Sequence, residues 1–164
     1  MSNPINRAIK KRANEIKVDV IYSKKGHYNA ASIWDVVHYV LGIITVSATA
    51  IIGLKNSSLD HKSIVFLALL SATLVSFMTF LKPQEKAAEH KQAGDDFDNL
   101  LQVISNFVEV DLLQGNDEQH SKQLAEIVDI KTKLNKNSLP IPKIAYLKTK
   151  KGINKGEASY TEEV

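Results

Sequence analysis

Two long uncharged stretches dominate the hydrophobic pattern of the chain. Residues 36–54 and 63–81 each hold 19 residues without Asp, Glu, Lys or Arg, and only eight residues, 55–62, separate them. A helix of that length extends about 28 Å, close to the ~30 Å hydrocarbon core of a bilayer. Helices of soluble bundles usually carry a charged stripe, which neither stretch has. The pattern therefore predicts two membrane spans that run antiparallel as a hairpin, rather than two buried helices of a soluble bundle.

The segments on either side of the spans show helical, amphipathic patterns. Apolar positions spaced by three and four predict a helix over residues 5–23. Gly26 is expected to loosen the chain before the first span begins. After the second span, Lys82-Pro83 predicts a break, because a proline disfavours helix at the residue before it. A long helix is then predicted over residues 84–113.

The C-terminal third is more polar. Residues 114–146 are predicted to form a helical extension, in which Asn116 caps the N-terminus of a helix that ends near residues 137–142. Residues 147–164 are rich in lysine and glycine, then acidic, and are expected to be disordered. The predicted fold is an all-α membrane protein: a two-helix transmembrane hairpin with a helical cytoplasmic extension built from the N- and C-terminal arms.

Charge predicts the orientation of the hairpin. Residues 1–35 carry seven Lys and Arg against three acids, and further lysines follow the second span. The positive-inside bias then predicts both termini in the cytoplasm and the loop with Lys55 and Lys62 outside. The net charge of +3 is too mild to suggest a nucleic-acid partner.

Composition and motifs argue against an enzyme. The 164 residues include no cysteine, which excludes disulfides, thiolate zinc sites and cysteine nucleophiles. No phosphate-binding glycine loop, GxSxG or HExxH motif occurs. No catalytic residue, metal ligand set or cofactor is predicted.

Small and polar side chains share one helical face in each span. The predicted faces are Asp35, His38, Gly42, Thr45 and Thr49 in the first span, and Ala68, Ala72, Ser76 and Thr79 in the second. Small residues at such intervals let helices approach closely in lipid, and hydroxyl groups can bond across. These faces either hold the hairpin together or, in an assembled oligomer, meet other subunits and line a polar path.

Two histidines lie at equal distances from the spans. His27 precedes the first stretch by nine residues and His90 follows the second by nine, so continued helices would bring them to the same depth. Other polar residues stand close to them in the sequence. The predicted cytoplasmic network, or contact site for a small anionic ligand, comprises Lys25, His27, Tyr28, Lys86, Glu89 and His90.

The helix over 84–113 carries a long apolar stripe. Such a stripe must be buried, and the candidates are the N-terminal helix, the following helix or another subunit. It is predicted to be the cytoplasmic oligomerisation surface. Its central residues are Phe97, Leu100, Leu101, Ile104 and Val108.

The strings that flank the spans resemble a known family. Residues 23–34 read SKKGHYNAASIW and residues 79–90 read TFLKPQEKAAEH, followed by Ala93, Gly94, Phe97 and Leu100. Over residues 5–112 the chain resembles SLATT domains, two-transmembrane effectors associated with nucleotide-sensing conflict systems in bacteria. On this basis residues 1–113 are predicted to form a SLATT-like domain.

The resemblance implies a cell-suicide effector of an anti-phage system in the bacterial inner membrane. It would be a homo-oligomer that permeabilises the membrane on a signal from a nucleotide second messenger, a nucleotidyltransferase or a nucleotide-sensor protein. Two alternatives remain: a two-span anchor or scaffold for a cytoplasmic partner, and a holin-like pore former, although holins tend to have smaller soluble parts.

Overall fold

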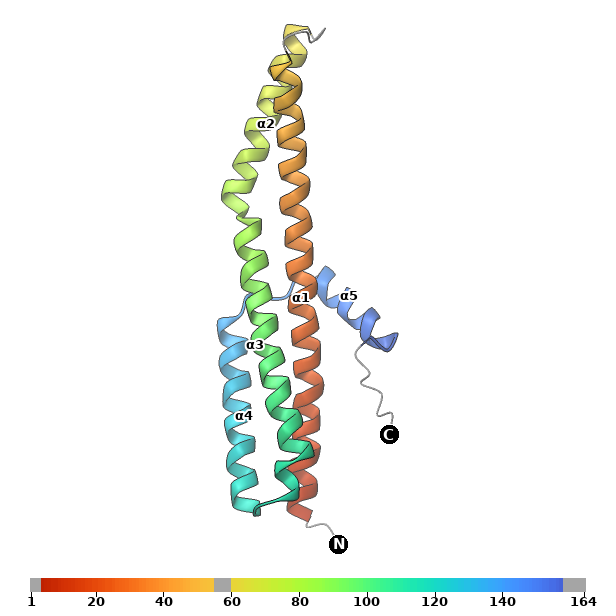
Figure 1. Cartoon of the computed structure of the whole chain (residues 1–164), viewed down its shortest axis with the longest axis vertical. Coiled ribbons are helices and arrows are strands. Elements are labelled where there is room, and N and C mark those ends of the chain that lie inside the picture. Colours follow the sequence, from red (N-terminus) through yellow and green to blue (C-terminus); the bar gives the residue numbers. More distant parts are fainter. Residues whose placement is uncertain (1–3, 55–59, 158–164) are drawn as a thin grey trace. The chain divides into compact units, whose positions relative to one another are not determined.

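The structure is a computed structural model that describes residues 4–54 and 60–157. Those residues are helical and include no strand. The elements are α1 (Pro4–Gly53), α2 (His61–Leu81), α3 (Pro83–Glu109), the 3-10 helix η1 (Asp111–Leu113), α4 (Asp117–Asn137) and α5 (Lys143–Asn154) (Figure 1). They form two compact units: the hairpin unit, Ala31–Ala88, and a helical bundle made of the described parts of residues 1–30 and 89–164.

The first helix is longer than predicted. α1 runs without interruption through Gly26, so the prediction that this glycine loosens the chain is wrong. Gly26 is instead a position of close approach: a Cβ there would lie 2.7 Å from Cδ1 of Ile141. Glycine in a helix interior costs about 1 kcal/mol relative to alanine, and here it leaves the space that the Ile141 side chain occupies.

The two apolar helices form the hairpin unit. The predicted first span ends close to Gly53, where α1 ends, and the second lies within α2. Asp60 caps α2 by accepting a hydrogen bond from the backbone N–H of Ser63, and the hydrogen bonds from Ser63 lower the pKa of this carboxylate. Lys55 of the predicted outside loop lies outside the described residues.

The predicted break after the second span is confirmed. α2 ends at Leu81, and Lys82 adopts a left-handed conformation with φ 47°, while its N–H donates to the carbonyl of Met78. α3 then begins at Pro83, which suits a first helical position because its missing N–H would have no partner there. α2 and α3 are therefore separate elements.

The apolar stripe of α3 lies inside the helical bundle. Phe97, Leu100, Leu101 and Ile104 are at most 5% exposed. They share one core cluster with Phe107 and with residues of the neighbouring helices, namely Ile9, Ala13, Ile16 and Val20 of α1 and Ile127 of α4, and Val108 packs against it. The prediction that this stripe is an oligomerisation surface is therefore wrong, because the first two candidates, α1 and α4, already bury it.

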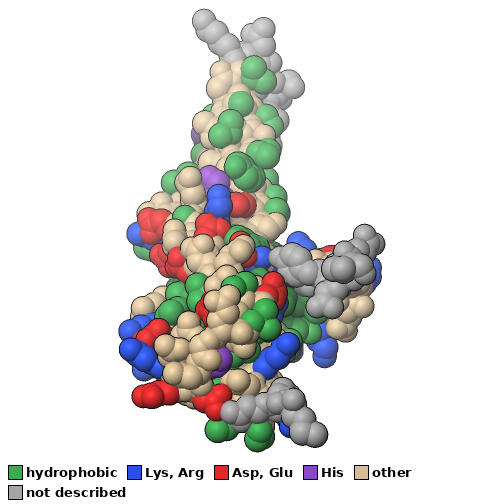
Figure 2. Space-filling view, turned by 60° about the horizontal axis from the view of Figure 1, so that its bottom comes forward, with side chains coloured by type: hydrophobic (Ala, Val, Ile, Leu, Met, Phe, Trp, Pro, Cys, Tyr) green, Lys and Arg blue, Asp and Glu red, His purple; other side chains and the backbone are tan. Residues whose placement is uncertain are grey.

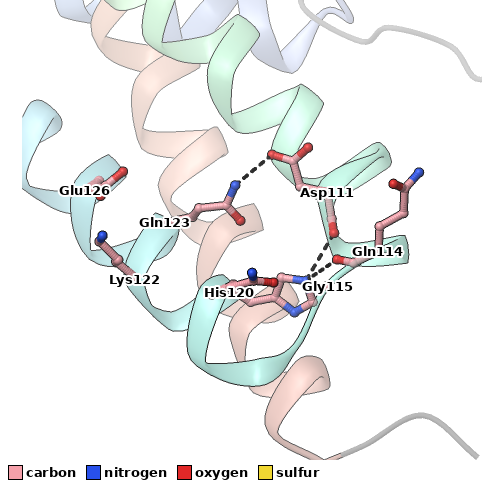
Figure 3. Close-up of a pocket in the computed structure, with 8 residues that line it drawn as sticks. Asp111, Gln114, Gly115, His120, Lys122, Gln123 and Glu126 are labelled. Carbon is pink, nitrogen blue, oxygen red and sulfur yellow. Dashed lines mark hydrogen bonds between the residues drawn. The ribbon is translucent and has the colours of Figure 1, made fainter.

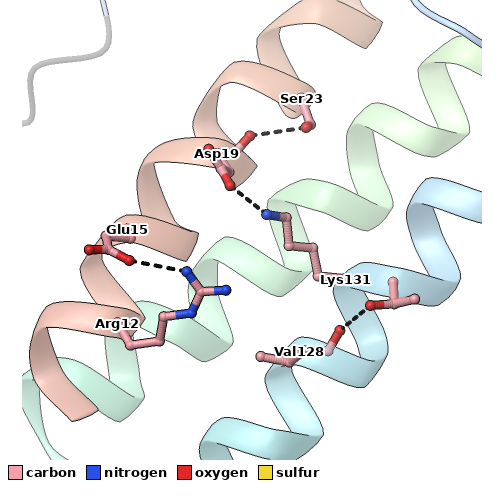
Figure 4. Close-up of polar contacts among 7 residues, drawn as sticks. Arg12, Glu15, Asp19, Ser23, Val128 and Lys131 are labelled. Carbon is pink, nitrogen blue, oxygen red and sulfur yellow. Dashed lines mark hydrogen bonds and ion pairs between the residues drawn. The ribbon is translucent and has the colours of Figure 1, made fainter. Parts of the chain in front are cut away.

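Ion pairs join the helices of the bundle around this core. Lys17 pairs with Glu109 at 3.2 Å and Lys24 with Asp98 at 2.6 Å, which connects α1 to α3. Lys131 of α4 reaches Asp19 of α1 at 2.6 Å (Figure 4). Their carboxylates are one-third or more exposed, so each pair contributes little beyond aligning the helices.

The C-terminal region contains more order than predicted. The N-cap at Asn116 is confirmed, with a reciprocal capping box between Asn116 and Gln119. However, α5 extends to Asn154, so the prediction of disorder from residue 147 is wrong for residues 147–154. The buried face of α5 consists of small residues, Ala145, Thr149 and Gly152, which a search for large apolar side chains overlooks.

Candidate functional site

His27 and His90 meet inside the helical bundle. Their Nδ1 atoms lie 2.9 Å apart, and the two side chains are 3% and 2% exposed. The His27 ring also stacks on Phe97, with ring centroids 5.5 Å apart. The structure thus brings together the two histidines that counting along the helices placed at the same level.

The geometry of the pair limits its protonation. A 2.9 Å contact between two Nδ1 atoms requires one ring to donate and the other to accept, so at least one ring is neutral. Burial lowers the pKa of His27 to about 4, assisted by repulsion from His90, and burial also lowers the pKa of His90. A neutral pair supplies no positive charge for an anion, so the arrangement favours the polar network over an anionic-ligand site.

Tyr28 makes a second polar contact between α1 and α3. Its hydroxyl donates to Oδ1 of Asp95 at 2.7 Å, and its pKa is raised to about 12, because burial and the carboxylate disfavour the phenolate. The ring lies against Gly94, where a Cβ would be only 2.8 Å from two ring carbons. Gly94 is therefore a close-approach position for the α1–α3 contact rather than an isolated glycine.

The remaining predicted network residues have other partners. Lys25 donates to Glu157 at 2.5 Å, and this bond lowers the pKa of Glu157. Lys86 lies in the hairpin unit, where its Nζ stands 4.5 Å from the centroid of the Trp34 ring. Glu89 makes no hydrogen bond to the histidines, and its charge only partly offsets the lowered pKa of His90. Of the six predicted residues, only His27 and His90 bond to each other, whereas Tyr28 bonds to Asp95.

Metal binding at this pair has too few ligands. Zinc sites require three or four protein ligands. Among residues 4–54 and 60–157, no group of three or more His, Asp or Glu side chains is arranged to hold an ion.

The predicted faces of the spans differ in exposure. All four residues of the α2 face are exposed. In α1, Asp35 and Thr49 are exposed and His38, Gly42 and Thr45 are partly buried. The half-buried side chains of α2 lie on another side of the helix and recur at helical spacing: Ser63, Ile64, Leu67, Leu70, Ser71, Leu74 and Met78. The small face of α2 therefore does not hold the hairpin together.

The hydroxyl groups of the spans bond within their own helices. Thr45 donates to the carbonyl of Leu41 and Thr79 to that of Val75, each four residues earlier and at 2.8 and 2.9 Å. Thr49 and Ser76 follow the same pattern. These groups satisfy themselves locally and need no partner across the hairpin.

His120 is a buried residue at the turn between α3 and α4. The sequence patterns did not single it out as a site. His120 is 2% exposed, and its Nε2 donates to the carbonyl of Gln114 at 2.7 Å (Figure 3). Its Nδ1 lies 2.9 Å from Oδ1 of Asn6 in α1. An open surface hollow of about 480 Å³ adjoins it, lined in part by Asp111, Lys122 and Glu126. Both ring nitrogens of His120 have partners within the bundle, so this residue connects the α3–α4 turn to α1.

Comparisons with protein-family models, with curated proteins and with solved structures gave no match to this chain. The resemblance to SLATT domains therefore rests on the residues quoted for it. In the structure four of those residues meet where α1 and α3 pack in the helical bundle: His27 contacts His90, and Tyr28 lies against Gly94.

Proposed function

We propose that this chain is a two-span membrane protein whose hairpin unit crosses the bilayer and whose helical bundle lies in the cytoplasm. The observation that carries the proposal is the exposure of the apolar helices. Two helices are long and apolar enough to span a membrane, and their most apolar windows are only 6% and 0% buried within the chain. Core helices of a soluble protein would be mostly buried.

The exposed side chains of these helices are large. Val46, Phe66 and Leu69 are 65–68% exposed. The space-filling view shows hydrophobic side chains open on the hairpin, whereas charged side chains gather on the bundle (Figure 2). Removing apolar surface from water is worth about 25 cal/mol per Å², so a contiguous surface of this kind needs a covering phase. A bilayer supplies one without a partner protein.

Labelling of single cysteines tests the orientation, because the chain has no native cysteine. A cysteine at exposed Lys122 of the bundle should react with a membrane-impermeant maleimide only after the cells are opened. A cysteine at Asp60, beside the outside loop, should react in intact cells. If the cysteine at Lys122 reacted in intact cells and the one at Asp60 only in opened cells, the proposed orientation would be overturned. If both cysteines reacted equally in intact cells, insertion would be overturned.

The proposed activity is permeabilisation of the bacterial inner membrane by an assembled effector, as the SLATT resemblance implies. Two helices cannot enclose a pore, so the activity requires several copies. Since the α3 stripe is buried in the bundle, the proposed contact between copies lies in the membrane. The exposed small face of α2, which includes Ala72 and Ser76, permits the close helix approach that membrane association favours.

Leakage of dye from vesicles tests this activity. Vesicles that contain the purified chain, with the product of any nucleotidyltransferase encoded beside it, should release dye. Ala72→Phe should abolish release and crosslinking between copies, because the bulky ring prevents close approach. Thr73→Phe, which adds the same ring at an exposed residue about 100° around the same helix from Ala72, is the matched control and should leave both unchanged. Absence of release under all conditions would refute permeabilisation and favour a membrane anchor for a cytoplasmic partner.

A further inference from the structure

α5 presents a basic and apolar surface that no other part of its unit covers. It carries four lysines and no acid in twelve residues. Ile144, Tyr146 and Leu147 are 72%, 49% and 52% exposed. Here the exposed basic surface of α5 means these three residues together with Lys143, Lys150 and Lys151. Among the described residues, none of these three lysines forms an ion pair.

The opposite face of α5 fixes the helix on α1. Asn29 donates to Oγ1 of Thr149 at 2.9 Å, and Thr149 is fully buried. Gly152 is buried close to Lys25, whose ammonium group pairs with Glu157 just beyond the helix. Because one face is held by these contacts, the exposed basic surface has a defined direction on the bundle.

The attachment point lies close to the first span along the chain. Asn29 precedes Val36, the start of the uncharged stretch, by seven residues. Even a fully extended segment of that length reaches at most about 25 Å. The residue to which α5 is attached therefore lies within about 25 Å of the start of the proposed first span, whatever the arrangement of the two units.

We infer that the exposed basic surface of α5 docks onto anionic lipid headgroups of the membrane that holds the hairpin. Interfacial helices combine lysines with apolar side chains that enter the headgroup boundary. α5 has this combination, because Ile144 and Leu147 are exposed among its lysines. A nucleic-acid site would not place exposed Leu147 at the centre of its basic face. A lysine near an anionic leaflet strengthens attachment about fivefold, so three lysines favour docking strongly once the hairpin is inserted.

This inference rests on the proposed insertion of the hairpin, and one experiment separates the two. The full chain carries a single cysteine in place of Leu147, labelled with an environment-sensitive dye. It is reconstituted into phosphatidylcholine vesicles with or without phosphatidylglycerol, and the vesicles contain lipids with a quencher near the headgroup. We expect strong quenching only with phosphatidylglycerol, and its loss at molar salt, where the Debye length falls to about 3 Å.

Matched variants define the outcome. A label at exposed Lys122 of α4 should remain unquenched. Replacing Lys143, Lys150 and Lys151 by Gln should weaken docking by roughly two orders of magnitude, whereas Lys122→Gln should not. A label at Val46 should be quenched by lipids that carry the quencher deep in the acyl chains, which reports insertion independently.

Each other result overturns the inference. Quenching at Val46 without quenching at Leu147 would leave the insertion standing and remove the docking. Equal quenching in vesicles without phosphatidylglycerol would refute the requirement for anionic lipid. Release of the Leu147 label by inorganic phosphate at constant ionic strength would assign the surface to a free anion, and quenching that requires two labelled copies would assign it to self-association. Loss of quenching at both sites would refute insertion as well.

Discussion

Acidification should destabilise the helical bundle through the His27–His90 pair. In the folded chain burial holds the pKa of His27 at about 4, against an ordinary value of 6.5. Below pH 6.5 the unfolded chain therefore binds more protons than the folded chain, and stability falls as pH decreases. The loss begins near pH 6.5, grows until about pH 4 and then levels off. Above pH 6.5 both states are neutral at His27, so the pair adds no pH dependence there.

The size of this effect follows from the shift. One pKa unit corresponds to about 1.4 kcal/mol, so the full loss attributable to His27 is about 3 kcal/mol. Between pH 7.5 and pH 5 the expected loss is about 2 kcal/mol, before carboxylates titrate appreciably. His90 adds to the loss because burial also lowers its pKa, although the charge of Glu89 works in the opposite direction.

Urea unfolding of the full chain in detergent, followed by circular dichroism between pH 7.5 and pH 5, measures this loss. His27→Asn is the matched control, because its amide keeps a polar group near the position of Nδ1 and removes the titrating ring. The variant should lose about 2 kcal/mol less than the native chain over this range. Equal pH dependence of the two proteins would refute the argument, as would a histidine resonance of His27 that titrates near pH 6.5 by NMR.

Three further changes probe the packing. Ile104→Asp should destabilise the bundle by about 4 kcal/mol or more, because it buries a charge in the core, whereas Val103→Asp on the exposed side of α3 should change the urea midpoint little. Gly94→Ala should cost about 1–3 kcal/mol through the clash with Tyr28; a cost that persists in a Tyr28→Ala background would contradict that clash. Asn116→Ala should lower the free energy of unfolding by about 1 kcal/mol through loss of the α4 cap, and an unchanged melting temperature would show that the cap is dispensable.

Local signals predicted much of the fold. The first uncharged stretch coincides with the last part of α1, which ends at Gly53, and the second lies within α2. Lys82-Pro83 marks the boundary with α3, because a proline restricts only the residues next to it. The capping box at Asn116 is equally local. In the N-terminal helix, the apolar face from Ile9 to Val20 is buried as its spacing indicates.

The errors arose where distant residues decide the outcome. Gly26 is a helix breaker by propensity, but Ile141 packs into the space that its missing side chain leaves. α5 has few large apolar residues, and its order comes from Thr149 meeting Asn29. Neither contact has a signature in the local pattern, since both join segments far apart in the chain.

The candidate site was predicted in part for the same reason. Counting along two helices brings His27 and His90 to the same depth, and the structure joins them. The count cannot identify Asp95 as the partner of Tyr28, nor Glu157 as the partner of Lys25, because side-chain direction around each helix decides those contacts. Lys86 was placed in the network by proximity in the sequence, but it lies over Trp34.

The burial of the α3 stripe changes where an assembly contact can lie. A variant such as Leu101→Asp would unfold the bundle and lose activity whether or not copies associate, so it cannot report on assembly. The small face of α2 has the opposite property, because Ala72 and Ser76 are exposed and their substitution leaves the core intact. The hydroxyl group of Ser76 already bonds to its own helix, so this face can meet lipid in a single copy and another helix in an oligomer without an unsatisfied polar group in either state. A surface that is stable in both environments is what the proposed effector would need in order to remain inactive as single copies and to assemble only on a signal.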